Sequence, residues 1–167
     1  MLRLRHAAQS AAFAGLLLAA GCSGKIDFEV TKNFTVTSTG TYQTSNQTVN
    51  LQDYPDAWKH RNKIKSVDIV GVDGKVIVTN APTATGTGRL WIRRPGGAAV
   101  LVGAATNHSL AQDASLTIVP SDAANDVIND AIRNDGIFEA YMEGSTSGAA
   151  LFEVAVTLRC KLTYKVP

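Results

Sequence analysis

Apolar and polar residues alternate along several segments of the chain, which predicts strands that bury one face. Early in the chain, Ile26, Phe28 and Val30 are separated by charged residues. Alternate side chains point to opposite faces of a sheet, so this period of two indicates half-buried strands. The same alternation or short β-branched runs occur in the segments 66–72, 75–79, 89–94, 98–102, 137–143 and 151–166. The chain is therefore expected to be mainly β.

The clearest alternation lies in the last segment, where every even position from Phe152 to Val166 is apolar or cysteine. This pattern turns Cys160 toward the core beside Leu158 and Leu162, where a cysteine behaves as a small apolar side chain. The segment is longer than the usual strand of roughly three to ten residues. We therefore expect a bend or bulge, with its two halves in different sheets.

Glycine-containing turns separate several of these segments. Asp73-Gly74 suits a two-residue hairpin turn, and the Pro95–Gly97 segment also suits a hairpin. Residues 144–148, which begin and end with glycine, separate the next two strands. Three hairpins would make the pairing largely antiparallel.

One short α-helix is expected near residues 122–135. Ser121 is a suitable N-cap, and Gly136 provides a stop. An apolar stripe with helical spacing runs between them, formed by Ala124, Val127, Ile128, Ala131 and Ile132. Together with the strands, this helix predicts an antiparallel β-sandwich, with an open β-barrel as the alternative, as one β-rich domain over residues 25–167.

The first 21 residues do not fit this domain. Arg3 and Arg5 precede an uninterrupted run of apolar and small residues over 11–21. The run is too short to cross a bilayer, which takes about 20 apolar residues. A basic start, a short apolar middle and small residues at the end are typical of a secretory signal peptide. An uncleaved membrane anchor is the other reading of this segment.

The end of this run, Leu18-Ala19-Ala20-Gly21-Cys22, resembles the lipobox of bacterial lipoproteins. The resemblance implies that residues 1–21 are removed and that Cys22 is acylated, with residues 22–24 as a lipidated tether. The partner would then be a membrane, bound through the acyl chains on Cys22. In bacteria with two membranes, Ser23 after the cysteine implies transfer to the outer membrane. Alternatively, Cys22 is incidental in an ordinary secretory signal.

The balance of charges bears on whether the protein binds nucleic acid. The full chain has 16 basic and 14 acidic residues, and removing Arg3 and Arg5 with the signal leaves the two signs equal. A near-neutral mature chain gives no support for nucleic-acid binding. The expected location is the cell envelope, attached through lipid.

The sequence predicts no catalytic residues, no metal site and no cofactor. Only His60 and His108 remain in the mature chain, both in segments expected to be polar turns, and no paired cysteines or metal-binding histidine spacing occurs. The favoured function is non-enzymatic binding or assembly, with an envelope protein or glycan as the partner. The alternatives are an envelope hydrolase with a site gathered from loops and a carrier of a small hydrophobic ligand.

The alternation over residues 89–94 predicts a binding surface on one strand. If Leu90 and Ile92 face the core, Arg89, Trp91 and Arg93 lie on the outer face, with an indole between two guanidinium groups. Such a surface would stack a sugar or base and neutralise an anionic group. The alternative is a Trp91 ring that is shielded by the arginine stems or buried against another sheet. Two charged runs, basic over 59–65 and mainly acidic over 122–143, are either solvated faces or docking surfaces for a partner of opposite charge.

Overall fold

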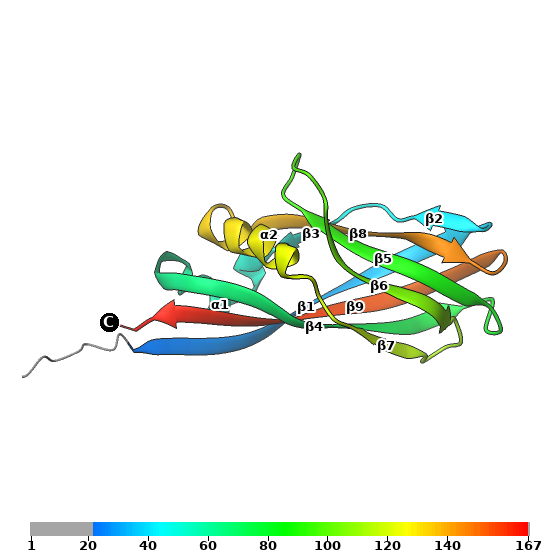
Figure 1. The fold of residues 1–167 in the computed structure, drawn as a ribbon, viewed down its shortest axis with the longest axis horizontal. Coiled ribbons are helices and arrows are strands. Elements are labelled where there is room, and N and C mark those ends of the chain that lie inside the picture. Colours follow the sequence, from blue (N-terminus) through cyan, green and yellow to red (C-terminus); the bar gives the residue numbers. More distant parts are fainter. Residues whose placement is uncertain (1–21, 167) are drawn as a thin grey trace, which may run out of the picture.

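The computed structural model describes residues 22–166, and the predicted signal peptide over 1–21 lies outside the described residues. Two antiparallel sheets lie face to face as a β-sandwich (Figure 1). The predicted sandwich is therefore confirmed, and the described strands do not close into the alternative barrel.

Each sheet contains strands from both halves of the chain. Sheet A has the order β1-β9-β4-β7, and sheet B has the order β2-β8-β5-β6, with β3 also paired to β8. Short helical segments follow β3, and one longer helix follows β7. The bounds are β1 Ser23–Ser38, β2 Thr41–Gln43, β3 Gln47–Asn50, η1 Leu51–Asp53, α1 Pro55–Trp58, η2 Arg61–Lys63, β4 Ile64–Thr79, β5 Thr85–Arg93, β6 Val100–Ser109, β7 Ser115–Ile118, α2 Asp122–Arg133, β8 Ile137–Thr146 and β9 Ala150–Lys165.

The expected division of the last strand between two sheets is wrong. β9 remains in sheet A along its whole length and pairs with β1 from Ser23 opposite Lys165 to Ser38 opposite Ala150, without a register shift. The irregularities lie in its other neighbour, because the pairing of β4 with β9 shifts register at three places. Such bulges increase local twist, so β4 accommodates the twist of this long sheet while β9 continues.

Two of the three predicted hairpins are also wrong. Asp73-Gly74 lies inside β4, where a Cβ on Gly74 would come within 3.2 Å of the Leu116 side chain on β7. This glycine therefore permits close packing instead of a turn. Residues 144–146 still belong to β8, only residues 147–149 lie between the strands, and β8 and β9 belong to different sheets. The Pro95–Gly97 hairpin is confirmed, since β5 pairs with β6 and Gly96 has a φ of 72°.

The chain also forms a strand where a polar turn was expected, because His108 lies on β6. At the other end of the chain, β1 begins at Ser23, so Ser23 and Gly24 of the expected tether belong to a paired strand. Thus no unpaired segment separates Cys22 from sheet A.

Side chains from both sheets and from α2 form one buried cluster. Phe34 of β1 and Phe138 of β8 are its largest fully buried members. The predicted apolar stripe of α2 is confirmed, because all five of its residues are buried. In Figure 1 sheet A extends beyond sheet B on one side, where α1 and α2 lie.

Two asparagines on α2 protect an exposed edge of sheet A. β7 pairs with β4 only over residues 72–75, which leaves the first half of β4 without a neighbouring strand on that side. The Oδ1 atom of Asn129 accepts a hydrogen bond from Val67 N at 2.8 Å, and Oδ1 of Asn125 accepts one from Ile69 N at 2.8 Å. Asn129 Nδ2 also donates to Val67 O at 2.7 Å. Helical residues four apart rise about 6 Å, which is close to the ~6.7 Å between alternate strand residues. Asn125 and Asn129 are therefore spaced to reach Ile69 and Val67.

The predicted core position of Cys160 is confirmed, since its residue is 1% exposed. Burial raises the pKa of its thiol from the usual 9.0 to about 12, and burial likewise raises the pKa of Tyr42 from 10.0 to about 12. The unfolded chain releases these protons at lower pH than the folded chain does. The contribution of these two groups to stability is therefore fully present below pH 9 and is lost progressively as the pH rises toward 12.

We expect urea unfolding to show this loss of stability above pH 9, with a smaller loss in Cys160→Ala.

In unacylated protein, a thiol reagent should modify Cys22 rapidly and reach Cys160 only after unfolding, because Cys22 is exposed and Cys160 is buried. Rapid labelling of Cys160 in the folded protein would contradict this assignment.

Candidate functional site

The predicted surface on β5 lies on the outer face of sheet B. Leu90 and Ile92 are buried, which turns Arg89, Trp91 and Arg93 away from the core. The antiparallel register places β8 partners directly opposite these three residues: Glu143, Tyr141 and Glu139 respectively. An aromatic pair thus lies between two pairs of opposite charge. We call these six residues the aromatic platform.

The two rings of the aromatic platform are parallel. Trp91 and Tyr141 have ring centroids 6.4 Å apart and planes inclined by 10°. The Cζ atom of Arg93 lies 5.9 Å from the Tyr141 centroid, within cation–π range. Both aromatic residues are half-buried, and the indole Nε1 is buried without a hydrogen-bond partner among the described residues. A ligand would therefore not reach the indole N–H.

The charges on the aromatic platform are balanced. Arg93 Nε lies 2.8 Å from Oε2 of Glu139, and Arg89 Nη1 lies 3.7 Å from Oε1 of Glu143. Asn46 Nδ2 donates a further hydrogen bond to Glu139 at 3.1 Å. The sequence alone suggested two free guanidinium groups for an anionic ligand. With both glutamates opposite, the platform suits an uncharged polar ring better than an anion.

The acidic run over 122–143 is also partly paired. Arg94 Nε lies 2.9 Å from Oδ2 of Asp130, and Arg94 Nη1 lies 2.7 Å from Oδ1 of Asp135. The hydrogen bond from Arg94 lowers the pKa of Asp135, and the same contact raises the pKa of Arg94. These contacts join the β5–β6 turn to the end of α2, so part of the run has a structural role.

A second feature lies where β1 begins and β9 ends. Cys22 is exposed, and its carbonyl oxygen accepts a hydrogen bond from Val166 N at 3.0 Å. The ring of Tyr164 covers Gly24, where a Cβ would come within 2.2 Å of that ring. His60 then stacks on Tyr164, with centroids 3.9 Å apart and planes inclined by 25°. This stack closes one side of an open groove.

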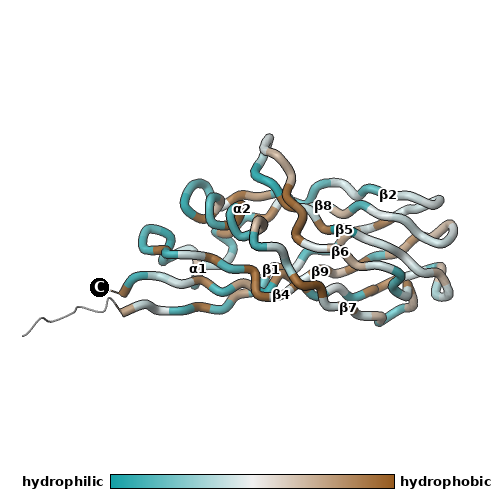
Figure 2. Tube along the Cα trace, viewed as in Figure 1, coloured by the Kyte–Doolittle hydropathy of each residue, from teal (hydrophilic) through white to brown (hydrophobic). Residues whose placement is uncertain are grey.

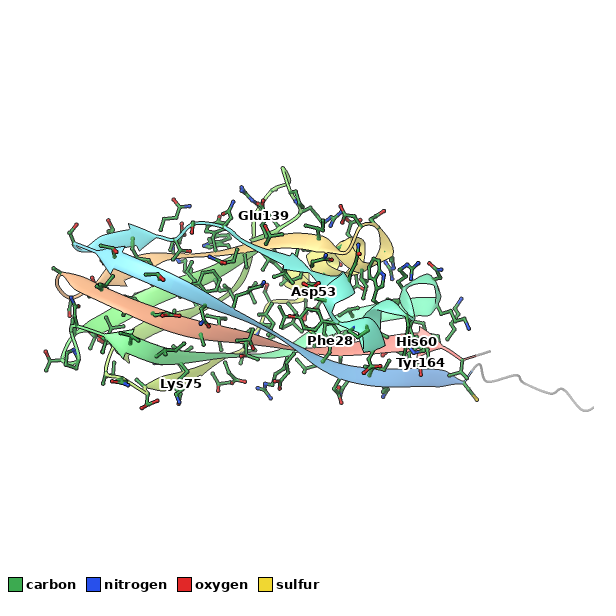
Figure 3. All side chains as sticks on the ribbon, turned by 180° about the vertical axis from the view of Figure 1, so that it is seen from behind. Phe28, Asp53, His60, Lys75, Glu139 and Tyr164 are labelled. Atoms are coloured by element: carbon green, nitrogen blue, oxygen red, sulfur yellow. The ribbon has the colours of Figure 1, made fainter. Side chains whose placement is uncertain are left out.

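The groove has a volume of about 600 Å³, which is within the ~300–1,000 Å³ typical of ligand sites. Aromatic side chains from three separate segments line it, and Phe28 and Tyr54 approach to 5.8 Å between centroids. In Figure 3, His60 and Tyr164 lie near the end where β1 begins, and Phe28 and Asp53 lie closer to the middle of the molecule. No local sequence pattern predicts the groove, because its walls come from β1, from β9 and from the segment between β3 and β4. The lining residues are Lys25, Ile26, Asp27, Phe28, Asp53, Tyr54, Pro55, Asp56, Ala57, Lys59, His60 and Tyr164.

The groove thus contains a histidine, carboxylates and hydroxyls, which are the groups expected for the hydrolase alternative. Among the hydrogen bonds of the described residues, none joins His60 to Asp53 or Asp56. Asp56 instead pairs with Lys59 Nζ at 2.7 Å, and this hydrogen bond lowers the pKa of Asp56. The aligned histidine–carboxylate pair that activates a nucleophile is not formed in this arrangement.

A third, smaller cavity lies between the sheets. Its volume is about 60 Å³, and its lining includes Tyr42, Leu90, Met142 and Phe152. A carrier of a hydrophobic ligand needs several hundred Å³ in one pocket. In this conformation the inter-sheet space is too small for such a ligand.

Within residues 22–166, no three His, Cys, Asp or Glu side chains gather as a metal site would require. No helix in the same described range is long and apolar enough to cross a membrane.

Comparisons with known proteins give weak matches only. No protein-family model matches the chain, and no curated protein is similar to it. A structure of Desmodium yellow mottle tymovirus is 13% identical, with a TM-score of 0.32 over 100% of this chain and 96% of the other. A Triatoma virus structure is 10% identical (TM-score 0.40; 99% and 80% covered), and decameric BFDV capsid protein is 8% identical (TM-score 0.40; 84% and 99% covered). Similarity this low supports no inference about function.

Proposed function

We propose that this chain is a lipid-anchored, non-enzymatic binding module of the bacterial cell envelope. The observation that carries the proposal is Cys22, which ends a lipobox-like sequence, is exposed, and directly precedes the first strand of the sandwich. Two or more acyl chains attach a protein stably, because each buried CH₂ contributes about 0.8 kcal/mol. In a bacterium with two membranes, Ser23 favours the outer membrane.

The aromatic platform supports an envelope glycan as the ligand. Trp91 and Tyr141 offer two parallel half-exposed rings, and sugar rings stack on such faces. The polar side chains that surround them, Glu139, Glu143 and Asn46, supply acceptors and a donor for hydroxyl groups. An envelope protein docked on the same rings is the other partner consistent with this surface.

The glycan proposal predicts that Trp91→Ala weakens binding about tenfold, because one stacked ring contributes about 1 kcal/mol or slightly more. Screening purified protein against bacterial envelope glycans would identify the ligand, and titration would give the two affinities. Thr35→Ala, on the exposed face of sheet A, is a matched control and should bind like the unaltered protein. No glycan binding, or equal affinity of the Trp91 variant, would contradict the proposal.

The groove favours a second candidate, an envelope hydrolase, because it brings His60 together with Asp53, Asp56 and two tyrosines. Catalysis by these groups would require His60 to leave its stack on Tyr164 and reach a carboxylate. Hydrolysis of ester or glycoside substrates that His60→Ala abolishes would support this candidate over the binding module.

A further inference from the structure

Unpaired positive charge is concentrated at the end of the sandwich where Cys22 lies. The antiparallel register places Ser23 beside Lys165 and Ile64 beside Tyr164, so the starts of β1 and β4 flank the end of β9. The loop before β4 lies at the same end and is largely hydrophilic (Figure 2). Exposed basic residues from all of these segments meet there, namely Lys25, Arg61, Lys63, Lys65 and Lys165. We call these five residues the basic end.

The basic end lacks partners of opposite charge. Within residues 22–166, no ion pair includes any of its five members. Arg61 instead lies over the Trp58 ring, with its Cζ atom 4.9 Å from the centroid. The segments 22–27, 53–65 and 163–166 together carry six basic and three acidic residues, and one of the acids, Asp56, pairs with Lys59. The excess charge is therefore positive.

At the next basic positions of β9, Lys161 and Arg159, acidic residues lie alongside. Lys161 of β9 lies opposite Asp27 on one side and Asp68 on the other. Beyond it, Arg159 Nε lies 2.7 Å from Oδ2 of Asp73. The positive excess therefore does not continue along β9 beyond its last positions.

The distance between the basic end and the anchor is short. Ser23 is already paired in β1, and the Cys22 carbonyl oxygen is held by Val166 N at 3.0 Å. No flexible segment therefore separates Cys22 from the folded domain. Acyl chains inserted in a bilayer through Cys22 would bring these charges to the headgroup layer.

We propose that the basic end docks directly on an anionic lipid surface and thereby orients the domain. This inference rests on the proposed anchoring at Cys22. Each lysine or arginine close to an anionic membrane strengthens association about fivefold. Because β1 begins and β9 ends at one end of the long axis (Figure 1), docking there directs the opposite end of the sandwich away from the bilayer. The aromatic platform on the outer face of sheet B then remains accessible to a ligand.

Vesicle binding of the chain from residue 22 with Cys22→Ser tests the docking without acyl chains. Sedimentation at low ionic strength would compare vesicles of phosphatidylcholine with vesicles of equal parts phosphatidylcholine and phosphatidylglycerol. The double variant Lys63→Gln, Lys65→Gln removes two charges of the basic end. The matched control, Lys32→Gln with Lys75→Gln, removes the same charge from positions farther along the sandwich.

We expect binding to anionic vesicles but not to neutral ones, a loss of at least tenfold in the Lys63, Lys65 variant, and a loss below about threefold in the control. Added salt should weaken the binding, because exposed charges are screened. Equal binding to neutral vesicles, or an equal loss in both double variants, would overturn the inference. Thermal melting of each variant establishes that it is folded. Since no acyl chain is present, failure here leaves the anchoring at Cys22 to be decided by its own experiment.

Discussion

Replacing Asn129 by alanine is expected to lower the free energy of unfolding by about 2–4 kcal/mol. Asn129 accepts a hydrogen bond from Val67 N and donates one to Val67 O, and Val67 is fully buried. Alanine would leave both backbone groups without partners away from water, and a buried unpaired group costs about 1–3 kcal/mol. Urea or thermal unfolding of the purified variant would measure the loss.

The exposed strand edge makes a second consequence of this change measurable. Without Asn129, α2 holds this edge less firmly, and where the helix detaches the first half of β4 presents unpaired backbone groups that another chain can pair with. We therefore expect the variant to associate more readily than the unaltered protein. Asn33→Ala is a suitable control, because Asn33 is exposed on β1 and should change stability by less than about 0.5 kcal/mol. Equal stability of the Asn129 and Asn33 variants would show that α2 does not protect this edge.

Replacing Cys22 by serine is expected to move the protein almost entirely from the membrane fraction to the soluble fraction. Serine has no thiol to acylate, and the basic end alone binds far more weakly than two or three acyl chains would. Fractionation of cells that express each form, followed by immunodetection, would measure the change.

The second cysteine offers a matched control for this experiment. Cys160→Ala removes the other thiol of the chain and should leave the protein with the membrane, because Cys160 is buried in sheet A. Continued membrane association of Cys22→Ser at high salt would contradict anchoring through this residue.

Alternation of apolar and polar residues was sufficient to predict the fold class. It identified the buried faces of β1 and β9 and the position of Cys160, because each depends only on the period of a single strand. The apolar stripe of α2 was also predicted from local sequence, because it depends only on the 3.6-residue period of one helix.

The pairing between distant strands could not be predicted from the periodicity of apolar residues. Asp73-Gly74 has the composition of a hairpin turn, but β9 and β7 lie along β4 at that point and hold it extended. Likewise, 16 residues of β9 exceed the usual strand length, and they stay in one sheet because β1 matches them residue for residue. Turn propensity is a local preference, and here the cross-strand partners override it.

The candidate sites differ in the same way, because some of their residues are predictable from one segment and others depend on how distant segments pair. Arg89, Trp91 and Arg93 were found from one strand, whereas the glutamates that balance the arginines lie on β8 and only the register identifies them. The groove near Cys22 depends on three segments, and its Tyr164–His60 stack forms over a glycine on a neighbouring strand. The basic run over 59–65 was visible in the sequence, but its position beside Cys22 was not.

Mass spectrometry of the amino-terminal peptide from protein purified out of bacterial membranes tests the central claim most directly. Cleavage before Cys22 and acyl chains on that residue are predicted, which would make Cys22 the first residue and add the mass of a diacylglyceryl group, with or without a further acyl chain on the amine. An amino terminus that retains residues 1–21, or an unmodified Cys22 on membrane-bound protein, would contradict it.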